Sequence, residues 1–189
     1  MTLTELPDLS AAFERSGLVD VAYVLTDSPL GTLLLAATAR GLARVSYLGV
    51  DRTEEDVLAE LASGLSPRIL ALPRRLEEPR RELDEFFSGR RQRFEIPLDW
   101  AATKPGFTRR VLRATSRIPF GETVSYKQVA GAAGSANAFR AAGTALGSNP
   151  LPIVVPCHRV LHSGGGLGGY TGGLGRKRTL LNMEGHQLS

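Results

Sequence analysis

The sequence predicts an α+β fold in two parts: a small α+β N-terminal domain, with a short antiparallel sheet plus helices, and then a mostly helical C-terminal domain. Strand-type runs dominate the first fifty residues, and helical spacing dominates after residue 107. The charge also changes sign along the chain. Residues 1–103 hold 12 Lys and Arg against 17 Asp and Glu, whereas residues 104–189 hold 11 against 2. We therefore expect domains over residues 1–103 and 104–189.

The N-terminal half alternates strand and helix patterns. Apolar β-type runs at 21–25 and 31–36 flank the turn-forming sequence 27–31 (DSPLG), which predicts a hairpin, and 41–48 is expected to be a third strand. Helical spacing predicts helices over 53–62 and 74–87. Residues 94–98 are expected to add one more strand before a linker over 99–106. The first ten or so residues are expected to form a frayed leader.

The C-terminal half contains a helix-turn-helix pattern. An amphipathic helix is predicted over 107–118 and ends at Pro119-Phe120-Gly121. Two short helices over 126–132 and 137–146 follow, joined by a glycine-containing turn. The second is rich in alanine and glycine, so we expect a smooth face from which Arg140 projects as the single cation. A closing helix is predicted over about 175–184.

Composition excludes several classes of protein. No apolar run approaches the ~20 residues that a membrane span needs, and the N-terminus lacks the basic and apolar regions of a secretory signal. A single cysteine cannot form an intramolecular disulfide or, alone, a thiolate zinc site. The sequence therefore predicts a cytoplasmic protein without metal or cofactor. The basic half favours a nucleic acid partner over the alternative, a solvated face without a partner.

Cys157 is the chemically distinctive residue. Two prolines bracket the apolar run 151–156, which we expect to be extended and buried, and deliver the cysteine at a rigid bend. A lone cysteine is more often a small core residue than a nucleophile. Here His158 and Arg159 follow directly, and an imidazole or cation beside a thiol favours the reactive thiolate. A carboxylate that orients the histidine must come from Glu122 or Glu184, the two acidic residues of this half.

Residues 156–160 (PCHRV) resemble the active-site motif of the O6-alkylguanine-DNA alkyltransferases, also called methylated-DNA–protein-cysteine methyltransferases. Five further segments fall in that family's order. The resemblance covers about residues 107–186, and the first half is similar only through 27–31 and the strand after it. The five segments are 121–126 (GETVSY), 140–143 (RAAG), 147–150 (GSNP), 169–174 (GYTGGL) and 184–185 (EG).

The resemblance implies a catalytic set. Cys157 corresponds to the thiol that accepts the alkyl group, and His158 to a base that acts on it through water. Glu184 corresponds to the carboxylate that orients this histidine. Asn149 corresponds to the hinge between the recognition helix and the active-site segment.

The resemblance also implies a set of substrate- and DNA-binding residues. Arg140 would enter the base stack in place of an extruded nucleotide, and Tyr126 would rotate that nucleotide and donate a hydrogen bond to the purine. Tyr170 and Thr171 would line the guanine pocket, with Thr171 near O6. The full expected set is Tyr126, Arg140, Ala141, Gly143, Pro152, Arg159, Tyr170 and Thr171. Lys177 and its arginine neighbours are expected to be a solvated or phosphate-facing patch.

The implied activity is direct reversal of DNA damage. An alkyl group would pass from O6-alkylguanine, or also O4-alkylthymine, in double-stranded DNA to Cys157 in a single turnover after base flipping. The recognition helix would enter the minor groove, and the protein would be a monomer in solution with cooperative binding on DNA left open. Three alternatives are a non-catalytic binder of alkylated DNA that recruits other factors, a helix-turn-helix regulator, and a cysteine hydrolase with multiple turnovers.

Overall fold

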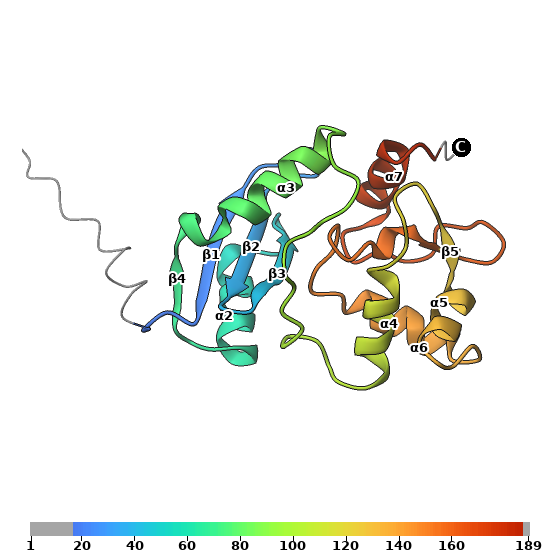
Figure 1. Ribbon diagram of the computed structural model, residues 1–189, viewed down its shortest axis with the longest axis horizontal. Coiled ribbons are helices and arrows are strands. Elements are labelled where there is room, and N and C mark those ends of the chain that lie inside the picture. The colour runs from blue at the N-terminus through green and yellow to red at the C-terminus, as the bar shows by residue number, and fades with distance from the viewer. Residues whose placement is uncertain (1–16, 187–189) are drawn as a thin grey trace, which may run out of the picture.

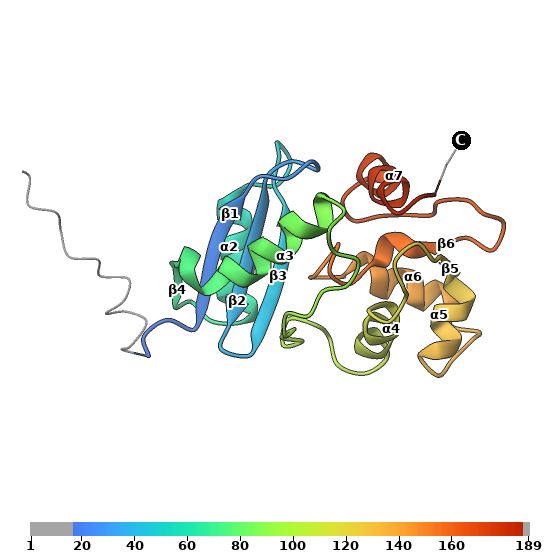
Figure 2. The same cartoon turned by 45° about the horizontal axis from the view of Figure 1, so that its top comes forward.

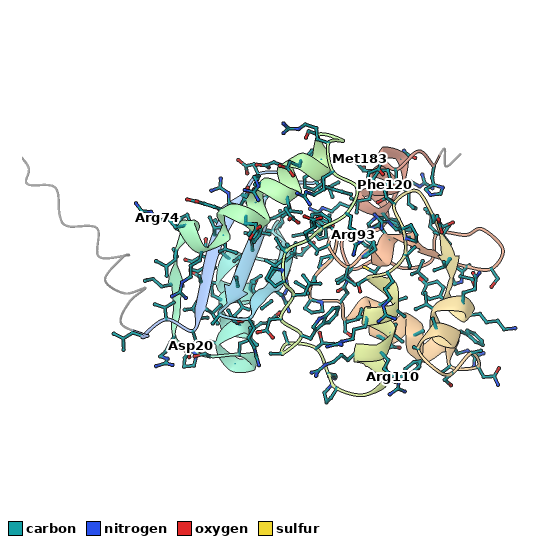
Figure 3. The ribbon with its side chains drawn as sticks, in the orientation of Figure 1. Asp20, Arg74, Arg93, Arg110, Phe120 and Met183 are labelled. Atoms are coloured by element: carbon teal, nitrogen blue, oxygen red, sulfur yellow. The ribbon has the colours of Figure 1, made fainter. Side chains whose placement is uncertain are left out.

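The computed structural model describes residues 17–186, so the predicted leader lies outside the described residues. The chain forms two lobes side by side (Figure 1): a sheet flanked by helices α2 (Glu54–Gly64) and α3 (Glu77–Phe87), and a group of helices that runs from α4 (Phe107–Thr115) to α7 (Leu174–Met183). The α+β fold class predicted from the sequence is confirmed. Side chains fill the junction between the lobes, where the ring centroid of Phe120 (Figure 3) lies 6.2 Å from that of Phe86.

The N-terminal sheet has four strands in the order β3-β2-β1-β4. The predicted hairpin is confirmed, because β1 and β2 pair antiparallel around the turn at 27–31. The sheet is mixed rather than purely antiparallel, since the short β4, which the sequence did not predict, runs parallel to β1. The strands are β1 (Val21–Thr26), β2 (Leu33–Thr38), β3 (Gly41–Tyr47) and β4 (Ile69–Ala71).

Helices cover both faces of this sheet, with α3 in front and α2 behind in the view of Figure 2. Alternate residues of β2 divide between the faces, as the two-residue period of a strand requires. Leu34 and Ala36 pack with α2 (Glu54–Gly64), whereas Leu33 and Leu35 belong to the larger core. The predicted helix over 74–87 is a 3₁₀ turn (Pro73–Leu76) followed by α3 (Glu77–Phe87).

The expected strand over 94–98 is not formed. Leu98 makes one isolated parallel bridge with Leu42, whose N–H donates to the carbonyl of Pro97 at 2.8 Å. A proline cannot donate a ladder hydrogen bond, so Pro97 prevents the pairing from extending toward residue 94. Gly41 makes the approach possible, because a Cβ atom there would lie 2.1 Å from the carbonyl oxygen of Pro97.

The C-terminal lobe contains the predicted helix-turn-helix. Helix α4 packs against the pair α5 and α6, and Ser125 caps α5 through a capping box with Gln128. A two-stranded parallel sheet, β5 with β6, joins the pair to the segment after Cys157. The elements are α4 (Phe107–Thr115), β5 (Val124–Ser125), α5 (Tyr126–Ala132), α6 (Phe139–Gly147), a 3₁₀ turn (Cys157–Arg159), β6 (Val160–Leu161) and α7 (Leu174–Met183).

The segment before Cys157 is buried, as predicted, but it is not extended. It is a compact turn in which the N–H of Val155 donates to the carbonyl of Leu151 at 2.8 Å and Ile153 has a φ of 74°. Asn149 explains the difference. Its side chain accepts from the N–H of Leu151 at 3.0 Å and donates to the carbonyl of Val155 at 2.9 Å, so local bonds replace a strand ladder.

Candidate active site

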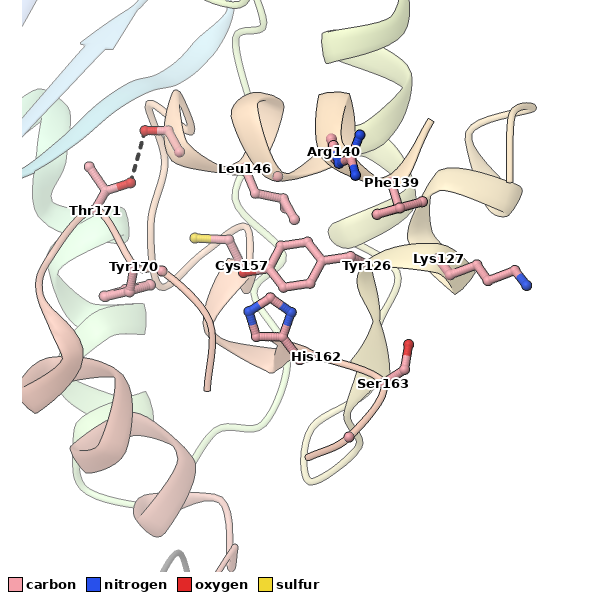
Figure 4. Close-up of a pocket in the computed structure, with 14 residues that line it drawn as sticks. Tyr126, Lys127, Phe139, Arg140, Leu146, Cys157, His162, Ser163, Tyr170 and Thr171 are labelled. Carbon is pink, nitrogen blue, oxygen red and sulfur yellow. Dashed lines mark hydrogen bonds between the residues drawn. The ribbon is translucent and has the colours of Figure 1, made fainter. Parts of the chain in front are cut away.

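A cavity of about 1010 Å³ opens between α5, α6 and the loop that follows β6 (Figure 4). Cys157 lies at its floor with 5% of its surface exposed. The mouth is formed by side chains that remain exposed or half-buried. Its main lining side chains are Tyr126, Phe139, Arg140, His162, Tyr170 and Thr171. The cavity therefore connects one buried thiol to the surface of the helix-turn-helix.

The thiol of Cys157 is held by an amide. Asn149 Nδ2 lies 3.1 Å from Cys157 Sγ. Burial raises the pKa of Cys157 to about 11, although the bond from Asn149 and the charge of Lys177 oppose this rise. The thiol is therefore protonated at neutral pH, and its use as a nucleophile requires a base.

His158 is placed to be that base. Its side chain is fully buried, and Nε2 lies 2.9 Å from Glu184 Oε1. Burial lowers the pKa of His158 despite the opposing effect of Glu184, which favours a neutral ring. Since an ionised carboxylate only accepts, Nε2 carries the proton and Nδ1 keeps its lone pair. Nδ1 is buried and has no partner among the described protein atoms.

Glu184 is shared between His158 and Arg159. Arg159 Nη2 lies 2.7 Å from Glu184 Oε1, and Nε lies 2.8 Å from Oε2. Burial raises the pKa of Glu184, but hydrogen bonds from His158 and Arg159 outweigh it and bring the pKa to about 2. Arg159 was expected to bind substrate or DNA, but in this structure it lies in the interior. Its side chain is 6% exposed, and Nη1 donates to the carbonyl of Ile118 at 2.6 Å, so it closes the buried charge network instead.

Lys177 also departs from its prediction. It is fully buried rather than part of a solvated patch. Its ammonium donates to the carbonyl oxygens of Val160, at 2.7 Å, and Leu167. Burial lowers the pKa of Lys177 to about 8, while the Cys157 thiolate would raise it. Burial of this lysine was not predicted, because a Lys between two arginines normally faces solvent.

Tyr126 starts α5 and forms one wall of the cavity. Its ring fits against two glycines: a Cβ on Gly168 would lie 2.5 Å from Tyr126 Oη, and one on Gly143 would lie 3.7 Å from Cε1. The tyrosine therefore requires glycine at 168, whereas a Cβ at 143 would be in ordinary contact with its ring. On the outer side, the ring centroid of His162 lies 5.2 Å away. Sequence reasoning did not single out His162.

The remaining residues predicted to bind DNA lie at two different sites. Arg140 and Ala141 are exposed on α6, and Arg140 lines the cavity. Pro152 is buried and lines a different cavity of about 750 Å³, between β3 and the start of the active-site turn. The structure thus brings Arg140 to the cavity of Cys157 and leaves Pro152 outside it.

The loop after β6 forms the cavity wall opposite α5, and the N-terminal domain holds that loop. Tyr170 Oη lies 2.8 Å from the hydroxyl of Tyr47, at the end of β3. Thr171 Oγ1 donates to the carbonyl of Gly147 at 3.0 Å, so it ties the loop to the end of α6. Arg176 stacks 4.6 Å over the Tyr47 ring and donates to Leu30 O at 2.8 Å. Tyr47 lies over a hundred residues away in sequence, and only tertiary contacts reveal its role.

Across residues 17–186, no group of three or more His, Cys, Asp or Glu side chains could hold a metal ion. Within the same range, no helix combines the length and apolar character that a bilayer crossing requires. The site is instead a buried thiol with its own histidine, carboxylate and amide, reached through a helix-turn-helix. Fold and site together define a DNA-binding protein with a cysteine nucleophile.

Comparison with known proteins shows the family to which this chain belongs. Residues 106–186 match the DNA-binding domain of 6-O-methylguanine DNA methyltransferase, and residues 21–100 match its ribonuclease-like domain. The chain therefore belongs to the 6-O-methylguanine DNA methyltransferase family. Its members transfer an alkyl group to a protein cysteine in the direct reversal of DNA damage, and this chain is such an alkyltransferase.

Relatives extend over most of the chain. It is 41% identical to the methylated-DNA–protein-cysteine methyltransferase of Mycobacterium leprae, over 86% of this chain and 91% of that protein. It is 38% identical to the human protein of the same name, over 86% of this chain and 79% of that protein. The structure of Mycobacterium tuberculosis OGT in complex with DNA superposes with a TM-score of 0.72 at 35% identity, covering 86% of this chain and 92% of that one.

Proposed function

We propose that Cys157 removes the alkyl group from O6-alkylguanine in double-stranded DNA and keeps it as a thioether. The observation that carries the proposal is the placement of one buried thiol at the floor of a cavity whose mouth lies on the helix-turn-helix. A guanine inside a duplex cannot present O6 to a thiol at such a depth, so the nucleotide must leave the stack. A cavity of about 1010 Å³ has room for a purine with its substituent.

DNA would be engaged through α6. Its outward face carries Arg140 and Ala141, both exposed, in a half of the chain where cations far outnumber acidic residues. Small side chains allow a helix to approach a groove closely, and a projecting arginine can occupy the space of an extruded nucleotide. We therefore assign α6 to the minor groove and Arg140 to the vacated position. Tyr126, at the cavity wall, would hold the extruded purine and donate a hydrogen bond to it.

The chemical step follows from the proton acceptors at the floor. His158 Nδ1 has a lone pair, so it can take the thiol proton of Cys157 through a bridging water. Glu184, ionised and bonded to Nε2, stabilises the imidazolium that forms. The thiolate attacks the alkyl carbon, an S–C bond forms, and the C–O6 bond breaks with its electron pair left on guanine. Overall the proton leaves the thiol and ends on the restored guanine, whose developing charge Tyr126 would help to balance.

Asn149 has two functions in this scheme. It maintains the turn before Cys157 and donates to the sulfur, so it favours the thiolate over the thiol. Cys157 is the only cysteine of the chain, so no second thiol can remove the alkyl group from the thioether. We therefore expect a single turnover for each molecule, without a cofactor.

The test is stoichiometric labelling. The protein is incubated with a duplex that carries O6-[³H-methyl]guanine, and label per protein is counted with time. We expect a plateau near one equivalent and no label on Cys157→Ala. Binding without labelling would indicate a non-catalytic DNA-binding protein, and continued product release would indicate a hydrolase. Either result would contradict the proposal.

We also propose that the protein is a monomer in solution. Its lone cysteine suggests a reducing, cytoplasmic environment. Sedimentation velocity with and without a duplex would show whether copies associate only on DNA.

A further inference from the structure

Phe139, the first residue of α6, is an exposed aromatic side chain at the mouth of the Cys157 cavity. Its exposed fraction is 45%. Among the described residues, the other large hydrophobic side chains with comparable exposure are Leu18, Leu25, Val50 and Leu174, and none of these lines the cavity. Phe139 also belongs to neither hydrophobic cluster of the fold. Its ring therefore contributes little to the core of the free protein.

The ring is paired with Arg140. The guanidinium carbon of Arg140 lies 5.6 Å from the ring centroid of Phe139, within the range of a cation–π contact. Figure 4 shows the two side chains next to each other at the mouth, on the far side of Tyr126 from Cys157. The first turn of α6 thus presents a cation and an apolar ring together. The sequence-based expectation of a smooth helix with one projecting arginine omitted this ring.

We propose that Phe139 is an apolar wedge that inserts between base pairs beside the extruded nucleotide. Two neighbouring residues of α6, Phe139 and Arg140, would then both enter the base stack. This inference rests on the proposed function. Proteins that bind the minor groove often insert an apolar side chain at a base step, which unstacks and kinks the duplex. Arg140 would offer hydrogen bonds to the base left without its partner, and Phe139 would replace the stacking that the neighbouring base loses.

Extruding a base has a free-energy cost, mainly from lost stacking and pairing. An aromatic ring against a base returns part of this cost without sequence preference, because each base has a π-face. The same contact removes from water a ring that the free protein leaves exposed. Phe139 should therefore favour extrusion, and it should have no effect on a substrate that needs no extrusion.

The experiment compares two substrates with one variant. Phe139→Ala and the wild type are reacted, in single-turnover conditions, with a duplex that carries O6-methylguanine next to 2-aminopurine, and with free O6-benzylguanine base. We expect about a tenfold lower transfer rate from the duplex, the order of effect of one base–aromatic stack. The rise in 2-aminopurine fluorescence that reports unstacking should fall in parallel. The rate with the free base should not change.

Two controls accompany the variant. Leu174→Ala removes another exposed apolar side chain, 49% exposed on α7 and outside the cavity lining, and should change neither rate. Phe139→Trp keeps a ring that can stack and should retain the duplex rate. Because Phe139 lies outside the core and alanine favours helix, Phe139→Ala should melt at the wild-type temperature.

If Phe139→Ala kept the wild-type transfer rate from the duplex and the wild-type fluorescence signal, the proposal that Phe139 is a wedge would be overturned. Equal slowing with both substrates would also overturn it, since Phe139 would then act inside the cavity and not on the DNA. Failure of the proposed function looks different: the wild type itself would then take no alkyl group from either substrate.

Discussion

The floor and the mouth of the Cys157 cavity are built in opposite ways. At the floor, Cys157, His158 and Glu184 are each 6% exposed or less, and fixed hydrogen bonds hold all three, with His158 Nδ1 left free to accept a proton. At the mouth, Arg140 and Phe139 are exposed, and their main contact is with each other. Proton transfer needs fixed partners in a region without bulk water, whereas DNA recognition needs side chains that are free to meet a partner.

This difference predicts how variants should behave. A change at the floor should slow transfer from both a duplex and a free base, and it should cost stability because buried polar partners are left unpaired. A change at the mouth should slow transfer only from the duplex and cost little stability.

The largest effect is expected for Glu184→Gln. The substitution leaves Arg159 as a buried charge without its counterion, and it leaves one acceptor oxygen where His158 and Arg159 now share two. We expect a loss of about 3–5 kcal/mol in the free energy of unfolding and loss of most transfer activity with both substrates. Urea unfolding and single-turnover rates measure the two effects. Glu122→Gln, at the other, exposed acidic residue of this half, is the control and should match the wild type.

The same pair of variants has a distinctive pH dependence. Because the pKa of Glu184 is about 2 in the folded protein and 4.5 is its ordinary value, its contribution to stability is complete above pH 4.5. That contribution is lost as the pH falls toward 2. The wild type and Glu122→Gln should therefore lose more stability between pH 5 and pH 2 than Glu184→Gln does. Parallel losses in all three would contradict the assignment of the low pKa to Glu184.

The next effect is expected for Lys177→Met. Since the charge of Lys177 lowers the pKa of Cys157, its removal should raise that pKa, so that less thiolate exists at neutral pH. We expect about tenfold slower alkylation of Cys157 by iodoacetamide, with the alkaline rise of the rate displaced to higher pH. The lost bonds to two carbonyl groups would also reduce stability, but they would not move a pH profile.

Arg178→Met is the control for charge, because it removes a cation from the next position, where the side chain is exposed. Its pH profile should overlay that of the wild type. An unmoved profile in Lys177→Met would show that the lysine only holds the loop in place.

A smaller effect is expected for Gly168→Ala. This glycine has a φ of +66°, which costs a non-glycine residue on the order of 1–3 kcal/mol, and the new Cβ would lie 2.5 Å from Tyr126 Oη. Displacement of Tyr126 should slow transfer from the duplex several-fold. Gly164→Ala is the matched control in the same loop, since a Cβ there meets nothing within 4 Å. Similar rates for both variants would contradict a constraint by Tyr126.

The floor and the mouth also differ in how far the sequence predicts them. Cys157, His158, Glu184 and Asn149 were expected to act together because they lie in ordered motifs, and the structure does bring them together. The burial of Lys177 and the turn over 151–155 were not predicted. Both depend on which carbonyl groups the folded chain leaves without partners, and residue types alone do not specify that.

The smallest effect is expected at the contact between the domains. Tyr47→Phe removes the hydroxyl bonded to Tyr170 but keeps the ring under Arg176, so we expect a cost of about 1 kcal/mol. Tyr170 lines the cavity itself, so a looser loop should slow transfer two- to five-fold with the duplex and the free base alike. Tyr23→Phe, on β1 and packed toward α2, removes a hydroxyl of the same domain far from this loop and should leave both rates unchanged. If Tyr47→Phe slowed transfer from the duplex alone, Tyr47 would act on DNA binding at the mouth of the cavity. Equal effects would show that the N-terminal domain completes the floor from across the interface.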